Sequence, residues 1–229
     1  MQTVRAEGWS DLPDALAELG LTRSRPTLVS VGAAAALSGD DSKRLEPLFG
    51  ELTSLAERRG AAVVDGGTDR GVMRLFGRAR ASGYRFPLLG VAVAELVSAT
   101  EVDDGRCPLE PNHTHALLVP GATWGDEVPW LARVATVVAD GAPSVTVLVN
   151  GGEITYDDAE ASIAESRPVV VAAGSGGTAD VIAAAVRGAP ANERAQALAG
   201  SKLVRAVDLS EDSGLRLSTE IDGILSERS

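Results

Sequence analysis

The chain has 229 residues, of which 45% are hydrophobic and 23% are charged, and this composition excludes an intrinsically disordered protein. A net charge of −11, from 32 acidic and 21 basic residues, opposes nonspecific binding to nucleic acid or to an anionic membrane, so we expect neither partner. No apolar stretch approaches the ~18 residues of a membrane span. The single cysteine, Cys107, cannot form an internal disulfide, and we therefore expect a cytoplasmic protein.

Short runs rich in valine and isoleucine alternate along the chain with segments of helical length. This alternation predicts βαβ units and an α/β fold with a mainly parallel sheet, in one domain that spans residues 1–229. Most runs are continuously apolar, as expected for strands that are covered on both faces. The expected strands are 27–31, 61–64, 88–93, 115–119, 145–149, 169–172 and 203–207.

Helical spacing of apolar residues marks the segments between these strands. Residues 41–59 carry leucines at helical spacing and end at Gly60, which is typical of a C-cap glycine. Other expected helices are 11–19, 71–82, 127–139, 156–165, 179–187 and 219–227. Residues 1–25 are expected to form an N-terminal extension, 95–114 a long loop, and 191–229 a C-terminal strand and helix. Long loops in compact α/β domains often bind ligands, although some only cover the surface.

The first candidate binding turn follows the expected strand 61–64 and precedes a helix. Glycines let the backbone approach a ligand, and a helix N-terminus offers N–H donors and positive dipole to a phosphate. The turn is neither a P-loop nor the dinucleotide GxGxxG pattern. An alternative interpretation is a glycine turn that only starts the helix. The candidate contacts are Gly66, Gly67, Thr68, Arg70 and Gly71.

Two later turns have the same strand, glycine turn and helix pattern. After strand 145–149 the chain reads NGGE, and after strand 169–172 it reads AGSGGT. Because the carboxyl ends of parallel strands lie at one edge of the sheet, we expect the three turns to share one crevice that binds a ligand. Asp180 lies in the first turn of a helix, where capping is the favoured role. The candidate contacts are Gly151, Gly152, Gly174, Ser175, Gly176, Gly177 and Thr178.

Four side chains near these turns have two interpretations each. Arg70, Arg74 and Arg78 recur every four residues and form one stripe on the helix after the first turn. Arg70, nearest to the helix start, can reach an anion, whereas we expect Arg74 and Arg78 to form a solvated face or a subunit contact. Trp124 can stack on a base or pack in a hydrophobic staple at a helix start.

Three segments together resemble a known family: GGTDRGVM, EPNHTHALLVPG and LVNGGEITYDDAEASIAESRPVVVAAGSGGTADVI. They resemble the prokaryotic relatives of the SLOG domain at the N-terminus of TRPM cation channels, over about residues 26–190. The wider superfamily includes the LOG phosphoribohydrolases. The resemblance implies a Rossmann-like three-layer fold that binds a nucleotide-derived ligand, such as ADP-ribose or an NAD-related compound, without a required cofactor. Channel activity is not implied, because the resemblance does not extend to the ion-channel part.

The resemblance to LOG enzymes implies a second function, cleavage of an N-glycosidic bond. Their loops read GGGxxGLM and PGGxGTxxE, and an Arg and Glu pair assists the cleavage. This chain matches the first loop, but in the second loop Ala173 replaces the proline and Val181 stands at the glutamate position. Binding is therefore the leading hypothesis. The alternatives are a hydrolase, with Asp180 or Glu153 as its candidate catalytic acid, and a ligand-free assembly subunit that forms a homo-oligomer.

The NHTH segment contains the two histidines of the chain. His113 and His115, with Glu110 and Cys107 nearby, are residue types that bind zinc. No fourth ligand has motif spacing, so we expect no metal and favour a structural or ligand-contact role. The segment is a hallmark of the TRPM-like family, and the resemblance implies that Asn112 and His113 contact the ligand.

Overall fold

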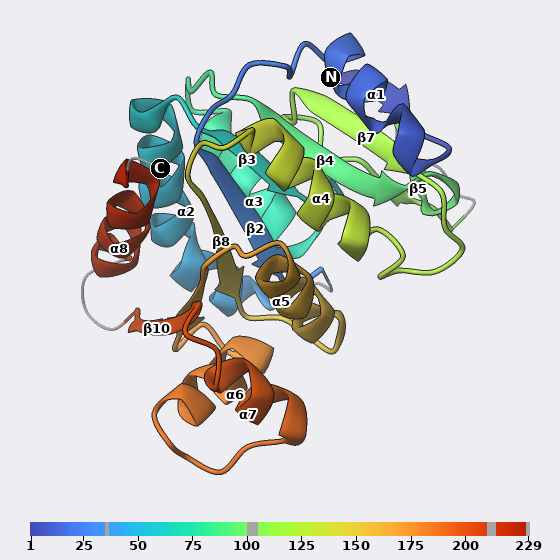
Figure 1. Cartoon of the computed structure of the whole chain (residues 1–229). Coiled ribbons are helices and arrows are strands. Elements are labelled where there is room, and N and C mark those ends of the chain that lie inside the picture. The colour runs from blue at the N-terminus through green and yellow to red at the C-terminus, as the bar shows by residue number, and fades with distance from the viewer. Residues whose placement is uncertain (35–36, 100–104, 210–213, 228–229) are drawn as a thin grey trace.

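An eight-stranded, fully parallel sheet lies between two layers of helices in the computed structural model, which describes residues 1–34, 37–99, 105–209 and 214–227 (Figure 1). The strands are β1 (Gln2–Arg5), β2 (Thr27–Gly32), β3 (Ala62–Asp65), β4 (Leu88–Val93), β7 (His115–Val119), β8 (Ser144–Val149), β9 (Val169–Ala173) and β10 (Val204–Asp208). Their order across the sheet is β1, β7, β4, β3, β2, β8, β9, β10. The predicted α/β class with a mainly parallel sheet is therefore confirmed.

The helices form two layers because each packs one apolar face on the sheet. One layer consists of α2 (Gly39–Arg59), α3 (Gly71–Arg80) and α8 (Leu215–Ser226). The other consists of α1 (Leu12–Glu18), α4 (Val128–Ala139), α5 (Ile154–Ala164), α6 (Gly177–Val186) and α7 (Glu193–Ala199). None of the helices in the described ranges is long and apolar enough to cross a membrane.

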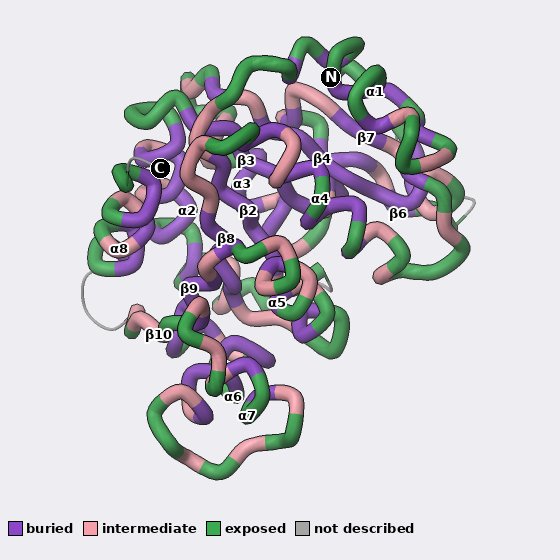
Figure 2. Tube along the Cα trace, in the orientation of Figure 1, coloured by how far each residue is buried: buried purple, intermediate pink, exposed green. Residues whose placement is uncertain are grey.

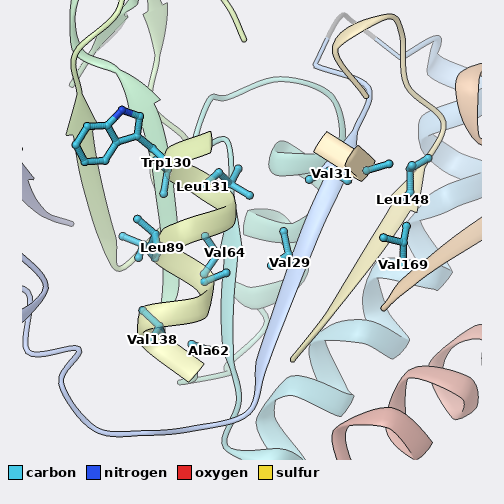
Figure 3. Close-up of a cluster of buried hydrophobic side chains, with 14 of the residues drawn as sticks. Val29, Val31, Ala62, Val64, Leu89, Trp130, Leu131, Val138, Leu148 and Val169 are labelled. Atoms are coloured by element: carbon cyan, nitrogen blue, oxygen red, sulfur yellow. The ribbon is translucent and has the colours of Figure 1, made fainter. Parts of the chain in front are cut away.

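Successive residues of each strand point to opposite faces of the sheet, and both faces are apolar. In β2, Leu28 packs with α2, α3 and α8, whereas Val29 and Val31 pack on the opposite face. Figure 3 shows that second face, where Trp130 and Leu131 of α4 lie over the central strands. The buried strands run through the centre of the molecule and exposed residues gather on helices and loops, as Figure 2 shows. This double burial explains why the strands read as continuous apolar runs.

The N-terminal extension contributes more than the predicted short helix. Strand β1 pairs in parallel with β7 at the edge of the sheet, and a short 3-10 helix, Trp9–Asp11, precedes α1. The indole of Trp9 stacks on Trp130, with ring centroids 3.8 Å apart. Of the four residues of β1 only Val4 is buried, so this edge strand has no apolar run that would have predicted it.

The predicted long loop at 95–114 contains short elements of its own. After β4 come a 3-10 helix at Ala94–Leu96 and two short parallel strands, β5 (Val97–Ser98) and β6 (Cys107–Pro108). Residues 100–104 of the predicted loop lie outside the described residues. Leu109 and Val97 pack on β4 and β7, so this segment covers one end of the sheet.

Strand β2 lies at the point where the strand order reverses. From β2 the chain crosses through α2 to β3 on one side, and it later returns through α4 to β8 on the other side. Gly32 at the end of β2 is in register with Val149 at the end of β8, so the two strands end together. Open α/β sheets bind ligands at such a switch point, outside the carboxyl ends of the strands.

Candidate functional site

A cavity of about 620 Å³ lies at the carboxyl ends of β2, β3 and β8, at this switch point. Its walls are the loops that follow the three strands, together with the residues that lead into α4. The end of β2, which has Gly32 and no glycine pair, and the described residues of the loop that follows form a large part of the wall. We call this space the large cavity.

The structure brings two of the three predicted glycine turns to the large cavity. The turns after β3 and β8 line it, and the turn after β9 does not. Asn112 and His113 do not line it either, and Gly71 instead lines a smaller neighbouring cavity. Gly67 does not line the large cavity, and the predicted residues that do are Gly66, Thr68, Arg70, Trp124, Gly151, Gly152 and Glu153.

Several amides of the glycine turns are already bonded to side chains of their own loops. The pairs are Gly67 with Asp65, Gly151 with Asn150, Gly152 with Thr155 and Gly174 with Asp180, at 2.8, 2.7, 3.2 and 2.6 Å respectively. An anion that took one of these amides would have to replace an internal hydrogen bond. The four bonds therefore close the turns on themselves, and they pair Asp180 of α6 with the turn that precedes its helix.

Close contact between loops requires two of the glycines. Gly71 has φ +47°, and a Cβ atom there would lie 1.6 Å from the carbonyl oxygen of Ala33 in the loop after β2. Gly177 has φ +55°, and its Cβ would lie 2.3 Å from the carbonyl oxygen of Gly151. Both conformations lie in the left-handed region that favours glycine. These two glycines thus hold neighbouring loops against each other.

The turn after β9 does not line the large cavity, but it holds the turn after β8 in place through hydrogen bonds. The buried Oγ of Ser175 accepts a hydrogen bond from the amide of Asn150 at 2.7 Å and donates one to the carbonyl of Ala172 at 2.6 Å. The Oγ1 of Thr178 donates to the carbonyl of Gly152 at 2.8 Å. Ser175 and Thr178 therefore shape the wall of the large cavity through the turn in front of them.

His113 lies in a buried network below the turn after β3. Its Nδ1 is 2.8 Å from Glu110 Oε2 and its Nε2 is 2.8 Å from Asp65 Oδ1. Burial favours the neutral ring, but the two carboxylates outweigh it and raise the pKa of His113 to about 9. Asp65 also accepts the amide of Gly67, so the network anchors that turn. Within the described ranges, no three His, Cys, Asp or Glu residues are grouped to hold a metal ion.

Three acidic residues of the large cavity were not predicted: Asp41 on α2, Glu127 beside the start of α4 and Asp158 on α5. Burial raises the pKa of Asp158 to about 8, and the charges of Glu127 and Asp157 act in the same direction. Burial also raises the pKa of Glu127. Glu127 lies outside the segments that carry the family resemblance, and Asp158 lies within one of them but in its helix, away from the glycine turns. Asp158 faces the cavity because α5 begins at the cavity wall and Asp158 follows Ile154 by one helical turn.

The large cavity combines an apolar wall with an acidic one. Val31, Met73, Leu131, Ile154 and Trp124 supply apolar surface, and Trp124 is 45% exposed. Among the described residues that line the cavity, four are acidic and one, Arg70, is an arginine. The four are Asp41, Glu127, Glu153 and Asp158. Such a cavity fits a flat, polar and uncharged group better than it fits a bare anion.

This chain is similar to known proteins both in sequence and in structure. A family model described as SLOG in TRPM, prokaryote, matches residues 25–216. A crystal structure of TM1055, a structural-genomics target, superimposes on the chain with a TM-score of 0.58. The two share 20% sequence identity over 85% of this chain and 99% of that chain. At this identity the likeness supports the Rossmann-like fold alone.

Proposed function

Because this chain belongs to the prokaryotic SLOG family related to TRPM channels, we propose that it binds a nucleotide-derived small molecule in the large cavity. ADP-ribose, NAD-related compounds and AMP are the candidate ligands. The observation that carries the proposal is the position of the cavity, about 620 Å³ at the switch point between β2 and β8. Small-molecule sites in proteins are commonly of this size.

The chemistry of the cavity supports recognition of the nucleoside part. A base stacks on aromatic side chains, and Trp124 lies at the cavity with nearly half of its surface exposed. Carboxyl groups form hydrogen bonds with ribose hydroxyls in either protonation state, and Glu127 and Asp158 both line the cavity. The ligand that fits this wall is a nucleoside that carries its negative charge elsewhere.

Isothermal titration of the whole chain with ADP-ribose, NAD, AMP and cyclic nucleotides tests the proposal. We expect at least one of them to bind and to raise the melting temperature, since a ligand that prefers the folded state stabilises it. Trp124→Ala should weaken that binding about fivefold or more, as loss of one stacking contact implies. Trp9→Ala is the matched control, because Trp9 is also an exposed indole but lies outside the cavity. No binding of any probe at millimolar concentration would refute the proposal.

A second candidate function is hydrolysis of an N-glycosidic bond, and the raised pKa of Asp158 in the large cavity favours it. A carboxyl group that keeps its proton near neutral pH can act as a general acid. Water would add to C1′ of the ribose as the bond to the base breaks, and Asp158 would protonate the departing base. Glu153, by contrast, is largely exposed and pairs with Arg194.

Release of free base from AMP distinguishes the two functions. Hydrolysis predicts adenine and ribose 5-phosphate as products, and it predicts that Asp158→Asn stops the release while AMP still binds. Binding without any release of base leaves only the first function.

A further inference from the structure

A second, smaller cavity lies beside the large one, against the start of α3. Its volume is about 200 Å³, and it is lined by Arg70, Arg74 and Arg78 together with Leu37, Ser42, Gly71 and Leu75. Arg70 and Leu37 also line the large cavity, so the two spaces adjoin. We call this space the arginine cavity.

The charges of the two cavities are opposite. Three arginines line the arginine cavity and none of its described lining residues is acidic, whereas four acidic residues and one arginine are among the described residues that line the large cavity. Asp69 pairs with Arg74, with Nε 2.7 Å from Oδ1, which offsets one of the three positive charges. Such a concentration of positive charge stands out in a chain with a net charge of −11.

Like charges at i and i+4 on a helix repel each other and destabilise it. Arg74 and Arg78 stand in this relation, and both side chains reach the same small cavity as Arg70. Asp69 already offsets part of the charge of Arg74, and Arg78 is exposed, so an anion between the two arginines would remove the repulsion that remains. Guanidinium groups bind phosphate through paired N–H donors, which makes phosphate the anion that this cavity fits best.

We propose that the arginine cavity binds the phosphate group of the ligand while the large cavity holds its nucleoside part, with Arg70 at the junction. This inference rests on the proposed function and adds to it the position of the charge. It also explains how a cavity with an acidic wall can belong to a nucleotide-binding protein. The glycine amides that are bonded within their own loops can then stay bonded when the ligand enters.

We test whether phosphate and nucleoside occupy separate cavities by measuring the affinities of the same variants for AMP and for adenosine. We expect the wild-type chain to bind AMP more tightly than adenosine. The double variant Arg74→Gln and Arg78→Gln should lower the affinity for AMP at least tenfold, because its charge-assisted contacts to phosphate are lost. The affinity for adenosine should stay within about twofold of the wild-type value. Inorganic phosphate should compete with AMP and not with adenosine.

Two control variants exclude unfolding and the loss of net positive charge as causes of weaker AMP binding. Arg78→Gln alone leaves the Asp69–Arg74 ion pair intact and should still weaken AMP, even if the double variant unfolds. The double variant Arg58→Gln and Arg216→Gln removes the same charge from exposed positions outside both cavities, and it should leave AMP affinity unchanged.

The outcomes separate this inference from the proposed function. If AMP and adenosine bind but the arginine variants bind AMP as the wild-type chain does, the inference is wrong and the proposed function stands. The inference is also wrong if the Arg58 and Arg216 control weakens AMP as much as the Arg74 and Arg78 variant. If neither AMP nor adenosine nor any other nucleotide probe binds, the proposed function itself fails.

Discussion

Replacing Gly71 with alanine tests whether the start of α3 is pressed against the loop that follows β2. The new Cβ would lie 1.6 Å from the carbonyl oxygen of Ala33, while an ordinary carbon contact needs roughly 3.5 Å. The loop or the helix must therefore shift by roughly 2 Å. Such a shift breaks the 3.0 Å hydrogen bond from the amide of Val72 to the same carbonyl.

The expected cost has three parts. Alanine at φ +47° costs about 1–2 kcal/mol relative to glycine. The lost hydrogen bond costs about 1 kcal/mol, and displacing packed backbone adds a further amount of about 1 kcal/mol or more. We therefore expect Gly71→Ala to lower the free energy of unfolding by about 3 kcal/mol or more.

Urea denaturation followed by circular dichroism measures this change, and Gly60→Ala is its matched control. Gly60 has φ +58°, close to that of Gly71, but a Cβ there would meet no atom within 4 Å. The control should cost only about 1 kcal/mol, because it carries the backbone strain without the collision. If the two variants lose equal stability, α3 does not press against the loop after β2. The shape inferred for the cavity wall would then be wrong as well.

Two further predictions concern pH. The pKa of His113 is raised from 6.5 to about 9 in the folded chain. Its ion pairs therefore stabilise the fold fully below pH 6.5, by about 3 kcal/mol. This stabilisation is lost as the pH rises through 9. His113→Gln should be less stable at pH 6 and should show no such loss in urea titrations between pH 6 and 10. The pKa of Asp158 is raised from 3.8 to about 8, so the folded chain binds the extra proton and stability falls as the pH rises from 4 to 8. Asp158→Asn should therefore be more stable than the wild-type chain at pH 9, by several kcal/mol, whereas Asp157→Asn, at an exposed carboxylate paired with Arg194, should not. A wild-type stability that stays flat from pH 4 to 10 would contradict both predictions.

Much of the fold could be predicted because burial on both faces leaves a local trace. The runs that became β4 and β9 are continuously apolar, and both strands are buried between two layers of helices. Gly60 was predicted to end a helix, and it caps α2 in the left-handed conformation. Strand β1 and helix α7 were missed, because β1 buries only Val4 and α7 only Ala195 and Leu198, which is too few residues to impose a period on the sequence.

The candidate site could be predicted only in part. Glycine turns at strand ends can be read from the sequence, and the parallel sheet brings two of them to one cavity. Whether a glycine is there for a ligand or for a neighbouring loop depends on residues far away in the chain, as Gly177 and Gly151 show. The same holds for the acidic wall, since Glu127 and Asp158 meet only when α4 and α5 are packed side by side.

The amino-acid sequence alone therefore determined the class of fold, the order of its elements and the family, because those depend on periodicity and on contiguous motifs. Only the tertiary structure decided which turns face the cavity, which amides are already bonded, and how charge divides between an acidic cavity and a basic one. The physical reason is that hydrogen bonding and Coulomb interactions act over a few ångströms in space, whatever the separation along the chain.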